Sequence, residues 1–367
     1  MTLYPNLILD ALRTVRYPGN GKNIVDLGMV EDDIRIDGNT VSFSLIFDRP
    51  TDPFAKSLVK AAEAAITTHV SPDVDIKGNI AVKFRQSVAP KPATPLPGVR
   101  NIIAVSSGKG GVGKSTVASN LAVALARQGY KVGLLDADIF GPSIPVMFGM
   151  QGQPVYLEQV DGHDMMLPLE SHGVLLQSIG LLVEPDSAVL WRGAMASRAL
   201  NQLITQVKWG ELDYLLIDMP PGTSDIHLSL VQTVPVTGAI VVSTPQEVAL
   251  ADARKGVSMF LNPQVNVPVL GIVENMAWFT PAPHPDERYY IFGRDGAVRL
   301  AEKMNVPMLG QIPLVADICQ CGDEGSPIAS RDSITGEAFI SLAARVVEAV
   351  DTRNADLPPT RTVTTHS

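Results

Sequence analysis

The segment SSGKGGVGKST, residues 106–116, constrains the fold of this chain more than any other stretch. It matches the P-loop pattern, a glycine followed after four residues by Gly-Lys-Ser, at Gly108, Gly113, Lys114 and Ser115. The apolar run NIIAVS precedes the segment, and a helical pattern ended by Gly129 follows it. The motif in this context predicts a strand, a phosphate-binding loop and a helix. A glycine-rich turn without a ligand is the alternative, and the agreement of motif and context disfavours it.

Each residue type in the loop has a role in binding phosphate. Glycines let backbone N–H groups turn inward around the phosphates, Lys114 adds a mobile cation, and Ser115 offers a hydroxyl group to Mg²⁺. We therefore expect a nucleotide to contact Gly108, Lys109, Gly110, Gly111, Val112, Gly113, Lys114, Ser115 and Thr116. Lys109 is not required by this pattern.

Short apolar runs alternate with helical stretches after residue 100. Continuous apolar segments are typical of strands that are buried on both faces, and this alternation predicts a mostly parallel sheet wrapped by helices, the α/β architecture of P-loop NTPases. The predicted strands are residues 101–106, 131–138, 214–222, 238–245, 268–276 and 307–313.

The chain of 367 residues divides at a proline-rich segment. Residues 87–99 contain four prolines and almost no charge, which predicts an extended linker. Residues 1–86 form a predicted small α+β domain, with strands at 40–48 and 75–84 around a helix at 54–70. Residues 100–350 form the predicted NTPase domain, and the polar segment 351–367 is predicted to be disordered.

Composition limits the partners and the compartment. The net charge of −9 offers no general attraction to nucleic acid or to an anionic membrane. No run approaches the roughly 18 apolar residues of a membrane span, so we expect a cytoplasmic protein. The two cysteines, Cys319 and Cys321, exclude a disulfide framework and fit a reducing compartment.

The string KGGVGKS, with its additional Lys109, resembles the deviant P-loop ATPases, the group of MinD, ParA and the nitrogenase iron protein. Within that group, DADIFGPSIPVMFG, YLLIDMPPGTSDIHLSL and PVLGIVENM resemble the Mrp branch of iron–sulfur cluster carriers. The resemblance covers residues 99–350, and IVDLGMVEDDIRI in residues 1–86 resembles the PaaD-like domain of iron–sulfur assembly. It implies an ATP-hydrolysing homodimer that passes clusters to apoproteins and works with assembly factors.

The resemblance also implies roles for individual residues. Lys109 would reach the nucleotide of a facing subunit, comparable to an arginine finger. Asp138 would orient or deprotonate the attacking water, and Asp136 would support the metal shell or the loop. Asp218 would hold Mg²⁺ through water. Two more contacts are implied, a backbone N–H of Gly222 to the γ-phosphate and the side chain of Asn275 to the adenine edge. Simple turn, capping or solvated roles are the alternatives for these residues.

The cysteines depart from the family pattern. Most carriers of this branch have Cys-x-x-Cys after the Asn-Met of GIVENM, and this chain has NMAWFTPAPHPDERYYIFG there. We predict that the aromatic residues of this segment are packing that replaces the missing site. Cys319 and Cys321 are predicted in an exposed segment, where two pairs across a dimer offer the four thiolates of a [4Fe–4S] cluster. Two small loop residues are the alternative.

Two other functions stay open at this stage. A positioning ATPase of the MinD or ParA type would use the same dimer without a metal. The polar tail with Pro358 and Pro359 cannot form the amphipathic helix that membrane attachment needs, and the net charge disfavours DNA. A scaffold that binds ATP and client apoproteins but has lost the cluster is the third possibility, because the usual Cys-x-x-Cys is absent.

Overall fold

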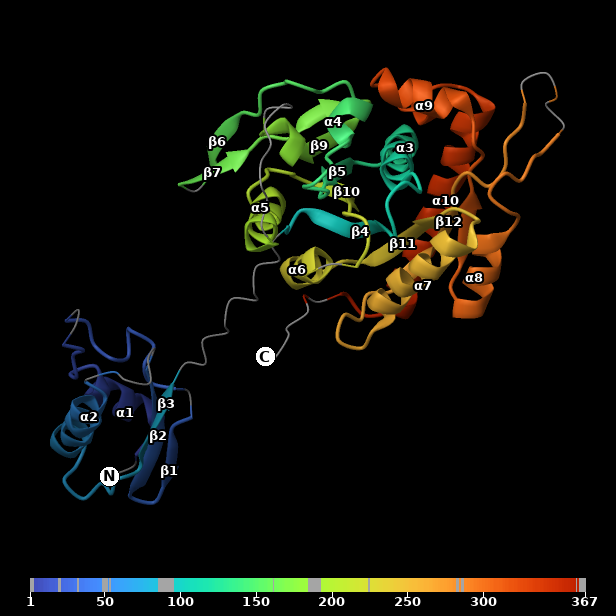
Figure 1. Cartoon of the computed structure of the whole chain (residues 1–367). Coiled ribbons are helices and arrows are strands. Elements are labelled where there is room, and N and C mark those ends of the chain that lie inside the picture. The colour runs from blue at the N-terminus through green and yellow to red at the C-terminus, as the bar shows by residue number, and fades with distance from the viewer. Residues whose placement is uncertain are drawn as a thin grey trace. The chain divides into compact units, whose positions relative to one another are not determined.

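The computed structural model describes residues 3–18, 21–31, 33–47, 52, 54–84, 96–160, 162–183, 193–223, 225–281, 284, 287–360 and 362. The chain divides into two compact units, Met1–Pro92 and Ala93–Ser367 (Figure 1). Most of the predicted linker, residues 87–95, lies outside the described residues.

The second unit is built on an eight-stranded sheet in the order β13-β12-β11-β4-β10-β5-β9-β8. The strands pair in parallel, except that β8 is antiparallel to β9. The prediction of a mostly parallel α/β sheet is therefore confirmed. The strands are β4 Val99–Ser107, β5 Val132–Asp136, β8 Leu169–Ser171, β9 Val174–Ser178, β10 Leu212–Asp218, β11 Gly238–Ser243, β12 Val269–Glu274 and β13 Met308–Gln311. A separate antiparallel pair consists of β6 Leu157–Val160 and β7 His163–Met166.

Helices cover both faces of the large sheet (Figure 1). One apolar core lies between the sheet and four helices, α5 Gly193–Thr205, α6 Asp225–Thr233, α7 Glu247–Leu261 and α8 Gly296–Met304. The other core lies against α3 Lys114–Arg127, α9 Ala316–Asp323 and α10 Ile334–Asp356, together with the short helix α4 Ile144–Met147. Because both faces are covered, the central strands are mostly apolar, and every residue of β5 and β11 is buried.

The first unit is a small α+β module with its own core. Its sheet has the order β1-β2-β3, with β1 Arg35–Asp37, β2 Thr40–Phe47 and β3 Ile80–Phe84. Two helices, α1 Pro5–Leu12 and α2 Ala55–His69, contribute Leu12, Leu58 and Ile66 to a buried cluster with the sheet. The helix α1 and strand β1 are additions to the elements that the sequence pattern predicted.

The structure corrects one boundary near the C-terminus. Helix α10 continues to Asp356, so the prediction of disorder from residue 351 is wrong for residues 351–356. The side chain of Arg353 donates to the carbonyl oxygen of Pro358 at 2.8 Å, which ties the segment after the helix back to it. Over the described ranges, no helix combines the length and the apolar composition that crossing a bilayer requires.

Candidate nucleotide-binding site

The phosphate-binding loop joins β4 to α3 in the middle of the sheet. Gly113 is the N-cap of α3 and has a φ of 80°, a left-handed conformation that favours glycine. A Cβ atom there would also lie 2.2 Å from Nδ2 of Asn275, so two independent constraints select glycine at this position. At Gly108, a Cβ atom would lie 2.1 Å from the backbone carbon of Asp252 in α7. The loop therefore packs closely against Asn275 at one end and against α7 at the other.

Beneath the loop, Lys114 forms a buried ion pair with Asp218. Its Nζ lies 2.6 Å from Oδ1 of Asp218 and 3.2 Å from Oγ of Ser115. The two paired side chains are 6% and 0% exposed. The other oxygen of Asp218, Oδ2, is buried and has no hydrogen-bond partner among the described residues. A buried carboxylate oxygen without a donor is costly unless a cation or ordered water meets it, so the residues present fit a hydrated Mg²⁺ at Asp218 and Ser115.

A second carboxylate lies beside this pair because of strand register. In the parallel pairing of β5 and β10, Asp136 is the partner of Asp218. Burial, followed by the charge of Asp218, raises the pKa of Asp136 to about 7. Burial also raises the pKa of Asp218, and the neighbouring Lys114 opposes that shift. Lys114 pairs directly with Asp218 and acts on Asp136 only through its charge, which opposes the rise in the pKa of that carboxyl group.

The contacts of Asp136 are structural ones. Its Oδ1 accepts the backbone N–H of Asp138 at 3.1 Å, and its Oδ2 accepts the backbone N–H of Ile144 at 3.2 Å and the hydroxyl of Ser178 at 3.0 Å. These bonds tie the segment after β5 to α4 and to β9. These contacts favour a role of Asp136 in supporting the loop that carries Asp138, and its role toward the metal shell stays a prediction.

Three other predicted residues lie around the loop in different environments. Asp138 is half-buried, and burial raises the pKa of its carboxyl group. Lys109 is half-buried, and its ammonium group makes no ion pair with the described part of the chain. The N–H of Gly222 already donates to the carbonyl oxygen of Ser107 at 2.9 Å. The predicted contact of Gly222 to a γ-phosphate would require this bond to break.

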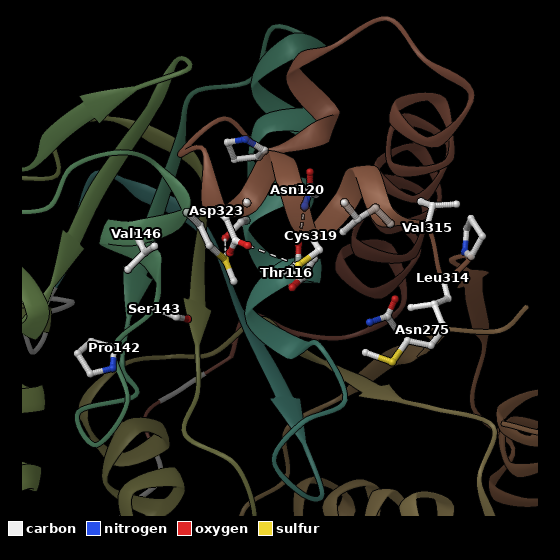
Figure 2. A pocket seen from close by; sticks show the side chains of 17 residues that line it. Thr116, Asn120, Pro142, Ser143, Val146, Asn275, Leu314, Val315, Cys319 and Asp323 are labelled. Atoms are coloured by element: carbon white, nitrogen blue, oxygen red, sulfur yellow. Dashed lines mark hydrogen bonds between the residues drawn. The ribbon is translucent and has the colours of Figure 1, made fainter. Parts of the chain in front are cut away.

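A cavity of about 530 Å³ lies beside the first turns of α3, between α4 and α9 (Figure 2). Thr116 and Asn120 of α3 form its floor, Ser143 and Val146 one side, and Leu314 and Val315 the other. Asn275 lies in its wall and donates from Nδ2 to the carbonyl oxygen of Val112 at 2.9 Å. Ligand sites of this kind usually measure about 300–1,000 Å³, so the cavity is large enough for a base and a ribose.

The structure separates the two cysteines. Both lie in helix α9 rather than in an exposed segment, and the prediction that both are accessible is wrong. Cys319 is exposed, lines the cavity and contacts Oδ2 of Asp323 at 3.6 Å. Cys321 is 1% exposed and belongs to the apolar core, and burial raises the pKa of its thiol. Among the residues described, no three His, Cys, Asp or Glu side chains are grouped to hold a metal ion.

Two aromatic side chains of the segment after Asn275 are exposed. Phe279 and Tyr289 are 36% and 49% exposed and pair through two 2.8 Å backbone hydrogen bonds. The guanidinium group of Arg288 lies over Trp278, 4.3 Å from the centre of the ring. The prediction that these rings form packing in place of the missing cysteines is wrong for Phe279 and Tyr289.

Sequence reasoning missed two residues that organise the site. Ser178 holds Asp136 from β9, a strand whose Gln177 and Ser178 interrupt the apolar pattern. Glu274 is completely buried at the end of β12, next to Asn275. A charged residue that closes an otherwise apolar strand was a signal that could have identified it.

The fold and the loop define a P-loop NTPase. A model of the family described as NUBPL iron-transfer P-loop NTPase matches residues 98–347, and a second model, described as iron-sulfur cluster assembly protein, matches residues 6–77. The chain belongs to this family of iron-transfer P-loop NTPases, and the resemblance inferred from the motifs is confirmed.

Relatives and solved structures agree with this assignment. An iron-sulfur cluster carrier protein of Synechocystis sp. is 43% identical, over 94% of this chain and 97% of its own length. The Escherichia coli protein of the same name is 53% identical, over 68% of this chain and 66% of its own. The structure of a nucleotide-binding protein from Archaeoglobus fulgidus, in complex with ADP, has a TM-score of 0.55 and 41% identity, covering 63% of this chain and 88% of that one.

Proposed function

We propose that this chain is an ATP-hydrolysing iron–sulfur cluster carrier that works as a homodimer. The observation that carries the nucleotide part is the buried Lys114–Asp218 pair beneath the loop, with an unpartnered carboxylate oxygen. The cargo follows from the similarity to carrier proteins over nearly the whole chain. The structure of the ADP complex of a 41% identical protein supports an adenine nucleotide as the ligand.

Binding of ATP replaces the carboxylate partner of Lys114. The ammonium group leaves Oδ1 of Asp218 for the β- and γ-phosphates, while loop N–H groups donate to the same oxygens. Asp218, through water, and the hydroxyl of Ser115 would hold Mg²⁺, which when bound neutralises charge on the phosphates. The base enters the cavity beside Asn275. If ATP binds the closed form of the dimer more tightly than the open form, it shifts the population of dimers toward the closed form.

Asp138 and Lys109 carry the hydrolytic step in this proposal. The carboxylate of Asp138 orients or deprotonates the attacking water, and Lys109 of the facing subunit stabilises the charge that develops on the transferred phosphoryl group. The absence of an ion pair to Lys109 among the described residues supports a partner outside the chain.

Asp138→Asn is expected to reduce ATP turnover by about 100-fold, because a positioned general base contributes about 10² to 10⁴. Since burial raises the pKa of Asp138, the wild-type rate should fall on acidification at a pH above the usual range of an aspartate. The raised pKa means that the base form is lost as the pH falls through it. The Asp138→Asn variant should show a low rate without this inflection in steady-state assays across the acidic and neutral range. If the rates of both proteins fell in the same way as the pH is lowered, the assignment of Asp138 as the base would be contradicted.

Binding of an iron–sulfur cluster requires accessible thiolates, and the two cysteines differ in this respect. A bridging [4Fe–4S] cluster with four thiolates from two chains requires Cys321 to leave the core, where it is 1% exposed. Cys319 alone gives two thiolates for each dimer, and the remaining ligands would come from outside the two chains. We propose Cys319 as the cluster ligand of each chain.

Anaerobic reconstitution followed by transfer to an apo-ferredoxin tests the carrier function. We expect Cys319→Ser to lose at least about 80% of the bound iron, while Cys321→Ser, the matched control on the same helix, retains most of it because its thiol is buried. Transfer from the wild type should depend on MgATP and should be lost in Lys114→Ala. Equal cluster content in Cys319→Ser and the wild type would reject Cys319 as the ligand.

A second candidate function is an ATPase that binds apoprotein clients without a cluster. The burial of Cys321 favours it, since it leaves one accessible thiol in each chain. It predicts that the chain holds an apoprotein client in an ATP-dependent way, and that this binding survives Cys319→Ser.

A further inference from the structure

One face of helix α9 lines the cavity in which the base is proposed to bind. The residues of this helix and its N-cap that form part of the wall are Val315, Ile318, Cys319, Gly322 and Asp323. Their spacing of three or four residues is that of one side of a helix. Cys321 falls on the opposite side, because two residues along a helix turn the side chain by about 200°. The helix therefore directs one thiol into the apolar core and the other into the cavity wall.

The thiol of Cys319 is held on this face by a contact along the helix. Its Sγ donates to Oδ2 of Asp323, one turn further on, at 3.6 Å. Cys319 is exposed as well as part of the cavity wall, so it lies where the cavity opens to solvent. Figure 2 shows its side chain among those that line the cavity. A group carried on this sulfur would extend into the same space.

The region proposed for the base lies close to this thiol. Asn275, Leu314 and Val315 belong to the wall on that side. Cys319 follows Val315 by four residues, which corresponds to a rise of about 6 Å along a helix. The cavity of about 530 Å³ is of a size that one ligand usually fills. A nucleoside bound there would take up the space next to Cys319.

We propose that a nucleotide and any group carried on the sulfur of Cys319 exclude each other from this cavity. The inference rests on the proposed function and adds its regulation, since the cluster and the nucleotide then compete within one chain. ATP that enters the cavity weakens the binding of the cluster, and a bound cluster weakens the binding of the nucleotide by the same factor. The expected dependence of cluster transfer on MgATP thereby acquires a physical cause.

Labelling of Cys319 with N-ethylmaleimide in the presence of ADP tests the exclusion. The sulfur adds across the double bond of the maleimide ring and the thiol proton passes to the ring carbon, so the labelling needs no oxidant. Cys321 should stay unlabelled because it is buried. The rate, followed by mass spectrometry, should fall in proportion to the fraction of chains without nucleotide, about tenfold at ten times the dissociation constant of ADP.

The reverse effect is measured by titrating ADP into chains with a bulky group at this position. We expect the maleimide adduct of the wild type and the Cys319→Trp variant to bind ADP at least about tenfold more weakly than the untreated wild type. Gln320→Trp is the matched control, since Gln320 is exposed on the same helix and lies outside the cavity wall. Its affinity for ADP should stay within about twofold of the wild type. Circular dichroism checks that each variant is folded.

The outcomes separate the inference from the function on which it rests. Labelling at the same rate with and without saturating ADP, in a wild type that calorimetry shows to bind ADP, would overturn the exclusion and leave nucleotide binding intact. Equal losses of affinity in Cys319→Trp and Gln320→Trp would also overturn it. So would protection of Lys114→Ala at an ADP concentration that this variant does not bind, because the effect would then arise outside the site. A wild type that binds no ADP would overturn the proposed function itself.

Discussion

Replacing Lys114 with alanine is expected to weaken ADP and ATP binding by at least about 100-fold. The ammonium group is the cation that the fold places under the loop, and the loss of one preorganised charged donor to a phosphate is worth about 2.7–4 kcal/mol. The substitution also leaves Asp136 and Asp218 buried side by side without a cation. Their carboxyl groups would respond by holding protons, because an unpaired charge inside a protein is unfavourable.

Calorimetric titration with ADP measures this effect without interference from hydrolysis. Circular dichroism should first show that the Lys114→Ala protein is folded, since removal of one partner of a buried pair can cost about 3–5 kcal/mol. If folding fails, Lys114→Met, which preserves most of the side-chain volume, replaces it. Binding within about threefold of the wild type in a folded variant would contradict the assignment of the loop.

Replacing Lys109 with alanine should have a different result, although the residue lies in the same loop. Lys109 is half-buried and unpaired among the described residues, so its loss should change ADP affinity by less than about twofold. We expect turnover to fall about 1,000-fold, the lower end of the range for a cationic finger supplied by a partner. Single-turnover hydrolysis of ATP measures it. Undiminished hydrolysis would count against catalysis by this residue.

Mixing two inactive variants tests whether Lys109 acts across the dimer. The Lys109→Ala chain binds ATP and lacks the finger, whereas the Lys114→Ala chain keeps Lys109 and binds no ATP. In a mixed dimer the second chain can supply Lys109 to the nucleotide of the first, so the mixture should recover part of the activity. If Lys109 acted on the nucleotide bound by its own chain, the mixture would stay as inactive as its two components.

Much of the fold could be predicted because buried parallel strands have a distinctive composition. The six apolar runs correspond to β4, β5, β10, β11, β12 and β13, and their order in the sheet follows from tertiary pairing rather than from local pattern. Strands β8 and β9 were missed because they are short and carry polar residues, including Gln177 and Ser178. Their stability comes from pairing with β5 and with each other.

The site could be predicted only where a motif fixes geometry within a few residues. The loop and the ends of β5 and β10 are local features, so Lys114 and Asp218 could be named from the sequence. Contacts that join distant segments could not. The bond from Asn275 to Val112 spans 163 positions, and the bond from Ser178 to Asp136 spans 42. The burial of Cys321 is likewise set by the way α9 packs.

Iron and acid-labile sulfide analysis of the full chain, purified under strict anaerobiosis, tests the carrier function most directly. The proposed bridging [4Fe–4S] cargo predicts about two iron atoms and two sulfides for each chain at full loading, together with a broad visible absorption that Cys319→Ser removes. Protein that is folded and binds ATP but contains neither iron nor sulfide, before and after reconstitution, would contradict the carrier function and leave the ATP-dependent scaffold in its place.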